Sequence, residues 1–319
     1  MTDPAIESGP PGSRLSTAIA RQFLRGGNYP WLKVASAIYR ERSRRVGGHR
    51  FSVTRPGGVT LDAWFCPAPP HAKPHGPKVA PPLPVLISHG IFEFKERYFD
   101  RAAWLNARGH DVILFDHRTH GRSTGKRLTM GVLERDDIAA VLDVAETRGL
   151  LGGSAASLRK VVTLGFSLGG GTVLQHAAMD DRVAGVIALA PFADFTAAIE
   201  TFRRCFAPWL DKGWVHAGFD SAAAEAGFEV QQASALDAIE RITVPILLVE
   251  AGKDTYLPPA RHTAKLRQRR GQVWGRTAEG LTVLNIPDAA HISLVRKRWP
   301  RLDAGIGAFL DSLNATRAD

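Results

Sequence analysis

Short apolar runs alternate with longer amphipathic stretches along most of the chain. Runs of four to eight apolar residues predict buried strands, and apolar residues that recur every three to four positions predict helices. The predicted strands are 85–88, 111–115, 160–166, 183–190, 244–250 and 281–286, and the predicted helices are 98–108, 131–148, 168–179, 259–269 and 300–313. This alternation predicts βα units and a mostly parallel, doubly wound α/β sheet.

A different pattern precedes these units. Residues 51–54 and 59–65 alternate apolar and polar positions around Pro56-Gly57-Gly58, which predicts a hairpin and an antiparallel start to the sheet. The proline-rich stretch 67–84 is then expected to form a stiff connecting loop.

Two amphipathic helices are predicted before the hairpin. In the first, from Arg14, apolar side chains recur at Leu15, Ile19 and Phe23, and Gly26-Gly27-Asn28 ends the helix. The second runs from position 31 to about position 45, and one of its sides carries Trp31, Val34, Ala35 and Ile38. Both helices are expected to pack on the body of the protein. The alternative is a basic amphipathic anchor, through residues 14–45, to an anionic membrane or an acidic partner.

The segment 192–233 interrupts the βα alternation between two predicted core strands. It has a helical composition and carries Phe195, Phe202, Phe206, Trp209, Trp214, Phe219 and Phe228. A helical insertion after a strand's carboxyl end is expected to form a lid over the site. Candidate substrate contacts are Phe202, Phe206, Trp209 and Trp214, and some of these aromatic residues are expected to form a small core of the lid itself.

These patterns divide the chain into four parts. Residues 1–13 are expected to be a disordered tail and residues 14–48 a basic helical extension. Residues 49–191 and 234–316 form the predicted α/β core, and residues 192–233 form the lid.

Composition narrows the functional classes. The chain has 319 residues, of which 45% are hydrophobic, and neither a run of about 18 apolar residues nor a secretory signal occurs. Cys66 and Cys205 are far apart and are interpreted as reduced thiols of a cytoplasmic protein. The net charge is +10, but nine basic residues and one acidic residue lie between Arg14 and Arg50. Since the rest is nearly balanced, a nucleic-acid partner is not expected.

The chemistry is expected at Gly165-Phe166-Ser167-Leu168-Gly169, which directly follows a buried strand and starts a small-residue helix. This is the pattern of a nucleophile elbow, in which a cramped turn presents the serine hydroxyl. An elbow serine requires a base and an acid that orients the base, in the order Ser, Asp or Glu, His. Asp254 follows the strand 244–250, and His291 follows the strand 281–286, so Ser167, Asp254 and His291 form the predicted triad.

Several other histidines and carboxylates have the residue types that these roles require. His89 ends a strand upstream of the serine, which fits an oxyanion loop better than a base. His117 and His120 also precede the serine, and with Asp116 they are interpreted as a charged tight turn rather than a metal site; His176 and His262 are expected to be structural. Asp288 and Glu250 are rivals of Asp254, the first in a turn and the second within a strand end.

The chain resembles the α/β-hydrolase superfamily over roughly residues 50–315. The residues that carry the resemblance are His89-Gly90, Asp116-His117-Arg118-Thr119-His120-Gly121-Arg122-Ser123, Gly165-Phe166-Ser167-Leu168-Gly169-Gly170, Gly252-Lys253-Asp254 and Ala290-His291. Within the superfamily it is similar to bacterial S33 aminopeptidase-like and BEM46-like serine hydrolases. It departs from them at Thr119-His120, where these relatives often carry a plain Arg-Gly-x-Gly turn.

The resemblance implies acyl transfer by Ser167, with the backbone N–H groups of Ile91 and Leu168 as the oxyanion hole and with no metal or organic cofactor. The expected partner is a small acyl substrate with an apolar group. A carboxylic ester is the first expectation. A thioester or an amide would be cleaved by the same mechanism, and a non-catalytic binding protein on the same fold is the alternative of another class.

Overall fold

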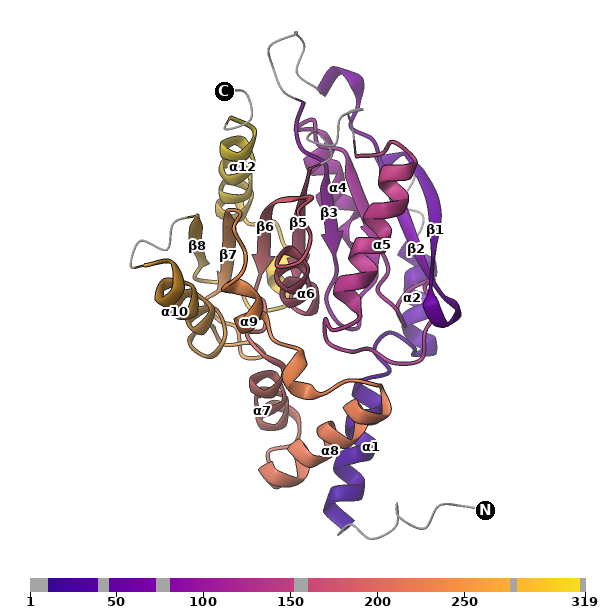
Figure 1. Ribbon diagram of the computed structural model, residues 1–319, viewed down its shortest axis with the longest axis vertical. Coiled ribbons are helices and arrows are strands. Elements are labelled where there is room, and N and C mark those ends of the chain that lie inside the picture. The colour runs from indigo at the N-terminus through magenta and orange to yellow at the C-terminus, as the bar shows by residue number, and fades with distance from the viewer. Residues whose placement is uncertain (1–10, 40–45, 73–80, 152–159, 276–279, 316–319) are drawn as a thin grey trace.

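The computed structural model describes residues 11–39, 46–72, 81–151, 160–275 and 280–315. An eight-stranded sheet with the order β1-β2-β4-β3-β5-β6-β7-β8 runs through the centre of the molecule (Figure 1). The strands are β1 (His49–Arg55), β2 (Val59–Cys66), β3 (Val85–Ser88), β4 (Val112–Phe115), β5 (Val161–Phe166), β6 (Val183–Leu189), β7 (Ile246–Ala251) and β8 (Leu281–Ile286). β2 pairs antiparallel with both β1 and β4, whereas the later neighbours pair in parallel. The predicted fold class is therefore confirmed.

Helices cover both faces of the sheet. They are α1 (Pro11–Phe23), α2 (Pro30–Tyr39), α4 (Phe99–Asn106), α5 (Glu134–Thr147), α6 (Leu168–Ala177), α7 (Phe195–Phe206), α8 (Lys212–Glu225), α9 (Ala235–Ile239), α10 (Thr263–Trp274), α11 (Ser293–Arg296) and α12 (Pro300–Ala315). One apolar cluster joins the sheet to α5, α6, α9 and α10, and a second joins it to α4, α11 and α12. Because both faces are covered, β3, β4 and β5 are buried along their whole length.

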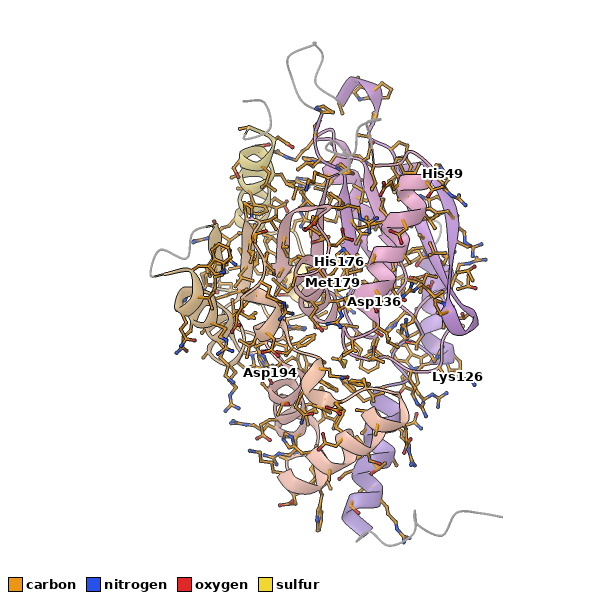
Figure 2. The ribbon with its side chains drawn as sticks, in the orientation of Figure 1. His49, Lys126, Asp136, His176, Met179 and Asp194 are labelled. Carbon is orange, nitrogen blue, oxygen red and sulfur yellow. The ribbon has the colours of Figure 1, made fainter. Side chains whose placement is uncertain are left out.

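A third apolar cluster lies at one end of the sheet, where α1, α7 and α8 gather (Figure 1). Phe195, Phe219 and Phe228 are buried in it, together with Ala20 and Leu24 of the N-terminal segment. The two ends of the helical insertion lie side by side, because Asp194 and Ser234 pair in an isolated antiparallel bridge (Asp194 is labelled in Figure 2). Some of the insertion's aromatic residues therefore form a core of their own, which α1 completes.

The predicted face of α1 is partly confirmed, since Ile19 and Phe23 pack against the third apolar cluster, whereas the predicted face of α2 was wrong. α1 packs on α8 through Ser16 and Ala20, and Leu15 of the predicted apolar stripe is exposed. In α2, Leu32 and Ser36 are buried, whereas Trp31, Val34 and Ile38 are 62%, 60% and 71% exposed. The small, polar Ser16 and Ser36 are buried but carry no hydrophobic signal, so periodicity missed part of the buried face of α1 and selected the wrong side of α2.

Several predicted boundaries also move. α1 begins at Pro11, within the predicted tail, and residues 1–10 lie outside the described residues. The predicted extension of the second helix through positions 40–45 and the loop positions 73–80 also lie outside them. α10 begins at Thr263, because the preceding Pro259–Arg261 form a short 3-10 turn. No helix in the described parts of the chain is long and apolar enough to cross a membrane.

Candidate active site

Ser167 occupies a strained turn between β5 and α6. Its backbone has φ +55° and ψ −112°, a region that side chains rarely adopt. The turn requires glycine on both sides: a Cβ on Gly165 would lie 2.1 Å from the carbonyl oxygen of Gly169, and one on Gly169 would lie 2.1 Å from that of Ser88. The N–H of Ser167 donates to the carbonyl of Leu189 in the neighbouring β6 (2.9 Å). This anchoring holds the serine hydroxyl at the end of the sheet.

The structure brings Ser167, His291 and Asp254 together. Nε2 of His291 lies 2.9 Å from Oγ of Ser167, and Nδ1 of His291 lies 2.6 Å from Oδ2 of Asp254. Since a carboxylate only accepts, the proton of the neutral imidazole is assigned to Nδ1, which leaves Nε2 free to accept the serine proton. Asp254 follows β7 and His291 follows β8, as the sequence predicts.

The second oxygen of the Asp254 carboxylate fixes its orientation. Oδ1 accepts the backbone N–H groups of Tyr256 (2.9 Å) and Leu257 (2.8 Å). The carboxylate therefore faces His291 without freedom to rotate, and this side chain is fully buried.

The rivals of Asp254 lie elsewhere. Asp288 is exposed and pairs with Lys253 at 2.7 Å, and the resulting hydrogen bond lowers the pKa of Asp288. Oε2 of Glu250 lies 3.4 Å from the side-chain amide of Asn285 on the neighbouring strand. Neither carboxylate contacts His291.

The loop at residues 89–93, which follows β3, carries the predicted oxyanion donor Ile91. Hydrogen bonds fix the backbone groups on either side of that N–H. Before it, the N–H of Gly90 donates to Oε2 of Glu93 (3.3 Å), and Nδ1–H of His89 donates to the carbonyl of Gly90 (2.7 Å). After it, the N–H of Phe92 donates to Nε2 of His120 (3.3 Å). Within the part of the chain that the structure describes, the N–H groups of Ile91 and Leu168 have no hydrogen-bond acceptor. Both are therefore available to a ligand.

Three buried histidines, His89, His117 and His120, pack beside this loop. Their ring centroids are 4.7 Å, 5.0 Å and 6.4 Å apart. Burial lowers the pKa of all three and brings that of His120 to about 3, so they are neutral at physiological pH. Asp116 accepts from Nζ of Lys95 at 2.6 Å and from the N–H of Arg122. The 116–123 turn is thus a hydrogen-bonded support; among the described residues no group of three metal-ligating side chains occurs.

His176 and His262 also have structural partners. Nδ1–H of His176 donates to the carbonyl of Arg135 on α5, which Figure 2 shows beside α6. Nδ1 of His262 accepts the N–H of Ala193 at 3.2 Å. Burial lowers the pKa of each to about 4. Both histidines therefore act as neutral hydrogen-bonding groups outside the Ser167 constellation.

A series of aromatic rings connects the two sides of the site. It runs from Tyr256, 5.7 Å from the His291 ring, through Phe206, Phe202 and Phe23 to Phe92, with successive centroids between 5.0 Å and 5.9 Å apart. We call these five residues the aromatic chain. One end lies at His291 and the other beside Ile91, so the aromatic chain borders the candidate site.

The four lid residues predicted to contact the substrate fall into two pairs. Phe202 and Phe206 belong to the aromatic chain. Within the described ranges no ring contact joins Trp209 or Trp214 to the aromatic chain, so the structure does not bring these two residues to the site.

Sequence reasoning missed three members of the aromatic chain. Tyr256 follows Asp254 by two residues, and Phe92 follows Ile91 directly, so proximity to predicted site residues was an available signal. Phe23 had no such signal, because only the packing of α1 on the insertion brings it 5.9 Å from Phe92.

The two cysteines remain separate. Cys66 is buried and Cys205 is exposed, and both are free thiols. Burial raises the pKa of Cys66 to about 12, so this thiol stays protonated.

The chain was compared with known proteins. A family model described as serine aminopeptidase, S33, matches residues 80–227, a range that includes Ser167 and ends before Asp254 and His291. The uncharacterized protein YqkD of Bacillus subtilis is 26% identical over 216 residues, which are 63% of each chain, so the match spans less than two thirds of that relative. The monoacylglycerol lipase of Mycolicibacterium smegmatis is 35% identical over 124 residues, covering 38% of this chain and 39% of the lipase.

The fold is shared with solved structures. An esterase of Pyrococcus furiosus superposes with a TM-score of 0.63 over 84% of this chain and 92% of the esterase, at 18% identity. At that identity the likeness establishes the fold alone. The sheet order, the strand–turn–helix at Ser167 and the family match agree: the chain has an α/β-hydrolase fold, and residues 80–227, a little under half of its length, are similar to the S33 serine aminopeptidase family.

Proposed function

We propose that the protein is a serine hydrolase that cleaves a carboxylic ester with an apolar acyl or alcohol group. One observation supports this most directly: the imidazole of His291 bonds to Asp254 on one side and to Ser167 on the other, at 2.6 Å and 2.9 Å. The combination of nucleophile, base and orienting acid is the arrangement that acyl transfer requires.

In the first half of the reaction, Ser167 Oγ attacks the ester carbonyl carbon and transfers its proton to Nε2 of His291. Asp254 retains the N–H at Nδ1 and stabilises the imidazolium that forms. The negative oxygen of the tetrahedral intermediate accepts the N–H groups of Ile91 and Leu168. The intermediate then collapses, the C–O bond to the alcohol breaks, and His291 returns the proton to the leaving oxygen.

In the second half, His291 removes a proton from water, which attacks the acyl-serine carbonyl. The same two N–H groups receive the second oxyanion, and Ser167 leaves with the proton held by His291. A carboxylic acid and the free enzyme result. No cofactor is needed for either half, because every proton is carried by the side chain of His291.

The aromatic chain supports an apolar substrate group. Its rings lie between the base and the 89–93 loop, where the acyl or alcohol portion of an ester bound to Ser167 would extend. We therefore assign Phe202 and Phe206 to a lid over that group.

Two measurements test the ester hydrolase proposal. A fluorophosphonate probe is expected to label the wild-type protein and not Ser167→Ala, and p-nitrophenyl esters of graded acyl length are expected to show kcat/KM that depends on Ser167. Equal labelling of both proteins would contradict the assignment of the nucleophile. Thioester and anilide analogues of the best ester distinguish thioesterase and amidase activity, and a binding protein without catalysis would turn over none of the three.

An exposed apolar face on α2 favours a second function, docking on an anionic membrane. Trp31, Val34 and Ile38 share that face, and the surrounding sequence carries nine basic residues against one acidic residue between Arg14 and Arg50. Apolar side chains can insert among lipid headgroups while basic residues bind anionic lipid.

Vesicle co-sedimentation tests this docking proposal. Wild-type protein is expected to bind phosphatidylglycerol vesicles more tightly than phosphatidylcholine vesicles, and salt is expected to weaken binding. The triple variant Trp31→Ser, Val34→Ser, Ile38→Ser should lose binding, while Val273→Ser, which alters an equally exposed apolar residue on α10, should keep it. Unchanged binding of the triple variant would refute the proposal.

A further inference from the structure

We propose that His120 is a positioning residue that holds the 89–93 loop in the form that presents the Ile91 N–H, and that the N-terminal turn at Gly26-Gly27 holds His120 in place. This inference rests on the proposed hydrolase function. It adds to the site a residue, His120, that belongs neither to the Gly-x-Ser-x-Gly motif nor to the proposed triad.

The hydrogen bonds of His120 assign its role. Nδ1–H donates to the carbonyl of Arg118 at 2.9 Å, and Nε2 lies 3.3 Å from the backbone N of Phe92. Because Nδ1 carries the proton, Nε2 presents a lone pair to the Phe92 N–H. This bond removes Phe92 from competition as an oxyanion donor and leaves the adjacent Ile91 N–H as the free donor of the loop.

The bond requires a neutral imidazole, since an imidazolium would present N–H against N–H. Complete burial keeps the imidazole neutral, because it disfavours the charged form, and the neighbouring His89 ring disfavours that form further; together they lower the pKa of His120 to about 3. Asp116 favours the charged form, but burial outweighs it. The acceptor is therefore maintained at physiological pH.

The loop itself needs this support. Phe92 has φ +59°, in the left-handed region that is unfavourable for a bulky residue. Its ring contacts Phe23 and Tyr29, with centroids 5.9 Å and 6.1 Å away, on either side of the N-terminal turn. The strained conformation is thus held by contacts from the turn and by the hydrogen bond to His120.

The N-terminal turn also fixes the imidazole. A Cβ on Gly27 would lie 2.6 Å from Cδ2 and 2.7 Å from Cα of His120, so the turn packs directly on this residue without space for a methyl group. Just before the turn, the carbonyl of Leu24 accepts the N–H of Leu128 at 2.8 Å. The α1–α2 segment therefore contributes to the site through His120 and Phe92.

The test compares His120→Leu, which removes the acceptor, with His120→Gln, whose side-chain carbonyl can accept near the position of Nε2. Amide exchange of Phe92, followed by NMR, reports the hydrogen bond without reference to catalysis. Exchange is expected to accelerate in His120→Leu and to remain slow in His120→Gln. With a p-nitrophenyl ester, kcat of His120→Leu should fall about 10- to 100-fold, with KM changed by less than about twofold, and His120→Gln should recover most of the loss.

Gly27→Ala tests the turn without replacing the His120 side chain. The added methyl group is expected to push the His120 imidazole out of position and to lower kcat, whereas Gly271→Ala, a change into open space on α10, should leave kcat unaltered. If His120→Leu does not fold, Gly27→Ala and His120→Gln carry the test through Phe92 exchange.

Three results would overturn the proposal: unchanged Phe92 exchange in His120→Leu or Gly27→Ala, unchanged kcat in either, or parallel losses of kcat and thermal stability that His120→Gln does not reverse. Failure of the hydrolase function itself would appear separately, as wild-type turnover that does not depend on Ser167.

Discussion

At the scale of single residues, the choice between Asp254 and Asp288 shows how position outweighs residue type. Both carboxylates follow the same edge of the sheet, yet Asp254 is buried and accepts from His291, whereas Asp288 is exposed and pairs with Lys253. Exposed ion pairs such as Asp288–Lys253 contribute little to stability. The two residues therefore offer a matched pair for substitution.

Asp254→Asn is expected to lower kcat by about 10⁴-fold, because an amide can donate to Nδ1 and so favours the tautomer with its proton on Nε2. Asp288→Asn should leave kcat within about twofold of the wild type. Steady-state kinetics with an aryl ester measure both. A similar loss in the two variants would show that Asp288 is also needed.

Phe206→Ala is expected to reduce kcat/KM for aryl or long-chain esters about tenfold, which corresponds to roughly 1.4 kcal/mol, and to affect acetate esters less. The reason is its place in the aromatic chain, where it stacks on Tyr256 at 5.7 Å. Trp209→Ala is the control, since that side chain is 76% exposed. An equal loss in Trp209→Ala would count against the division of the lid aromatics.

At the scale of elements, the contact between α1 and α8 joins the N-terminal extension to the lid. Gly218 permits close packing, because a Cβ there would lie 2.6 Å from the backbone carbon of Ser16. Arg21 adds an ion pair with Glu225 at 2.6 Å on the exposed side. The close backbone approach, rather than this exposed pair, is expected to determine the strength of the contact.

Gly218→Ala is expected to destabilise the protein by about 1–3 kcal/mol, because the added methyl group must displace α1 or distort α8. Gly271→Ala, within α10 and facing open space, should instead stabilise by up to about 1 kcal/mol through helix propensity. Urea unfolding measures both changes. A stabilised Gly218→Ala variant would show that α1 does not pack on α8 in this way.

At the scale of the whole molecule, buried histidines link stability to pH. Burial lowers the pKa of His89, His110, His117, His120, His176 and His262. In the unfolded chain a histidine takes up a proton below about pH 6.5, whereas these folded groups, whose pKa values are lowered, stay neutral to lower pH. The unfolded state therefore binds more protons in that window, and the folded state loses stability as pH falls.

The free energy of unfolding is expected to fall between pH 6 and pH 5 by roughly 1 kcal/mol for each histidine that remains neutral. Urea unfolding at pH 7, 6 and 5 measures the slope before most carboxylates titrate. His176→Gln should reduce the slope by about one proton, because its wild-type pKa is about 4. A stability that is independent of pH across this window would contradict the neutral, buried state of these rings.

The sequence alone predicted the succession of core strands along the chain, the strand–turn–helix at Ser167 and the strand-end positions of Asp254 and His291, whereas the order of the strands within the sheet came from the structure. These features follow from local signals: uninterrupted apolar runs specify buried parallel strands, and the carboxyl ends of such strands meet at one edge. The sequence favoured Asp254 over Asp288 because Asp254 follows a strand's carboxyl end whereas Asp288 suits a turn, and the structure adds the distance of 2.6 Å from Asp254 to His291.

Tertiary structure decided what local patterns could not encode. Which sides of α1 and α2 are buried depends on contacts of small residues without a hydrophobic signature: the backbone of Ser16 lies close to Gly218, and the hydroxyl of Ser36 donates to Glu96 at 3.2 Å. Phe23 and His120 reach the 89–93 loop from distant parts of the chain, through contacts between residues about 70 and 30 positions apart. The position of Ser167 is therefore specified by its local turn, whereas the surroundings that shape the candidate site depend on packing between distant segments.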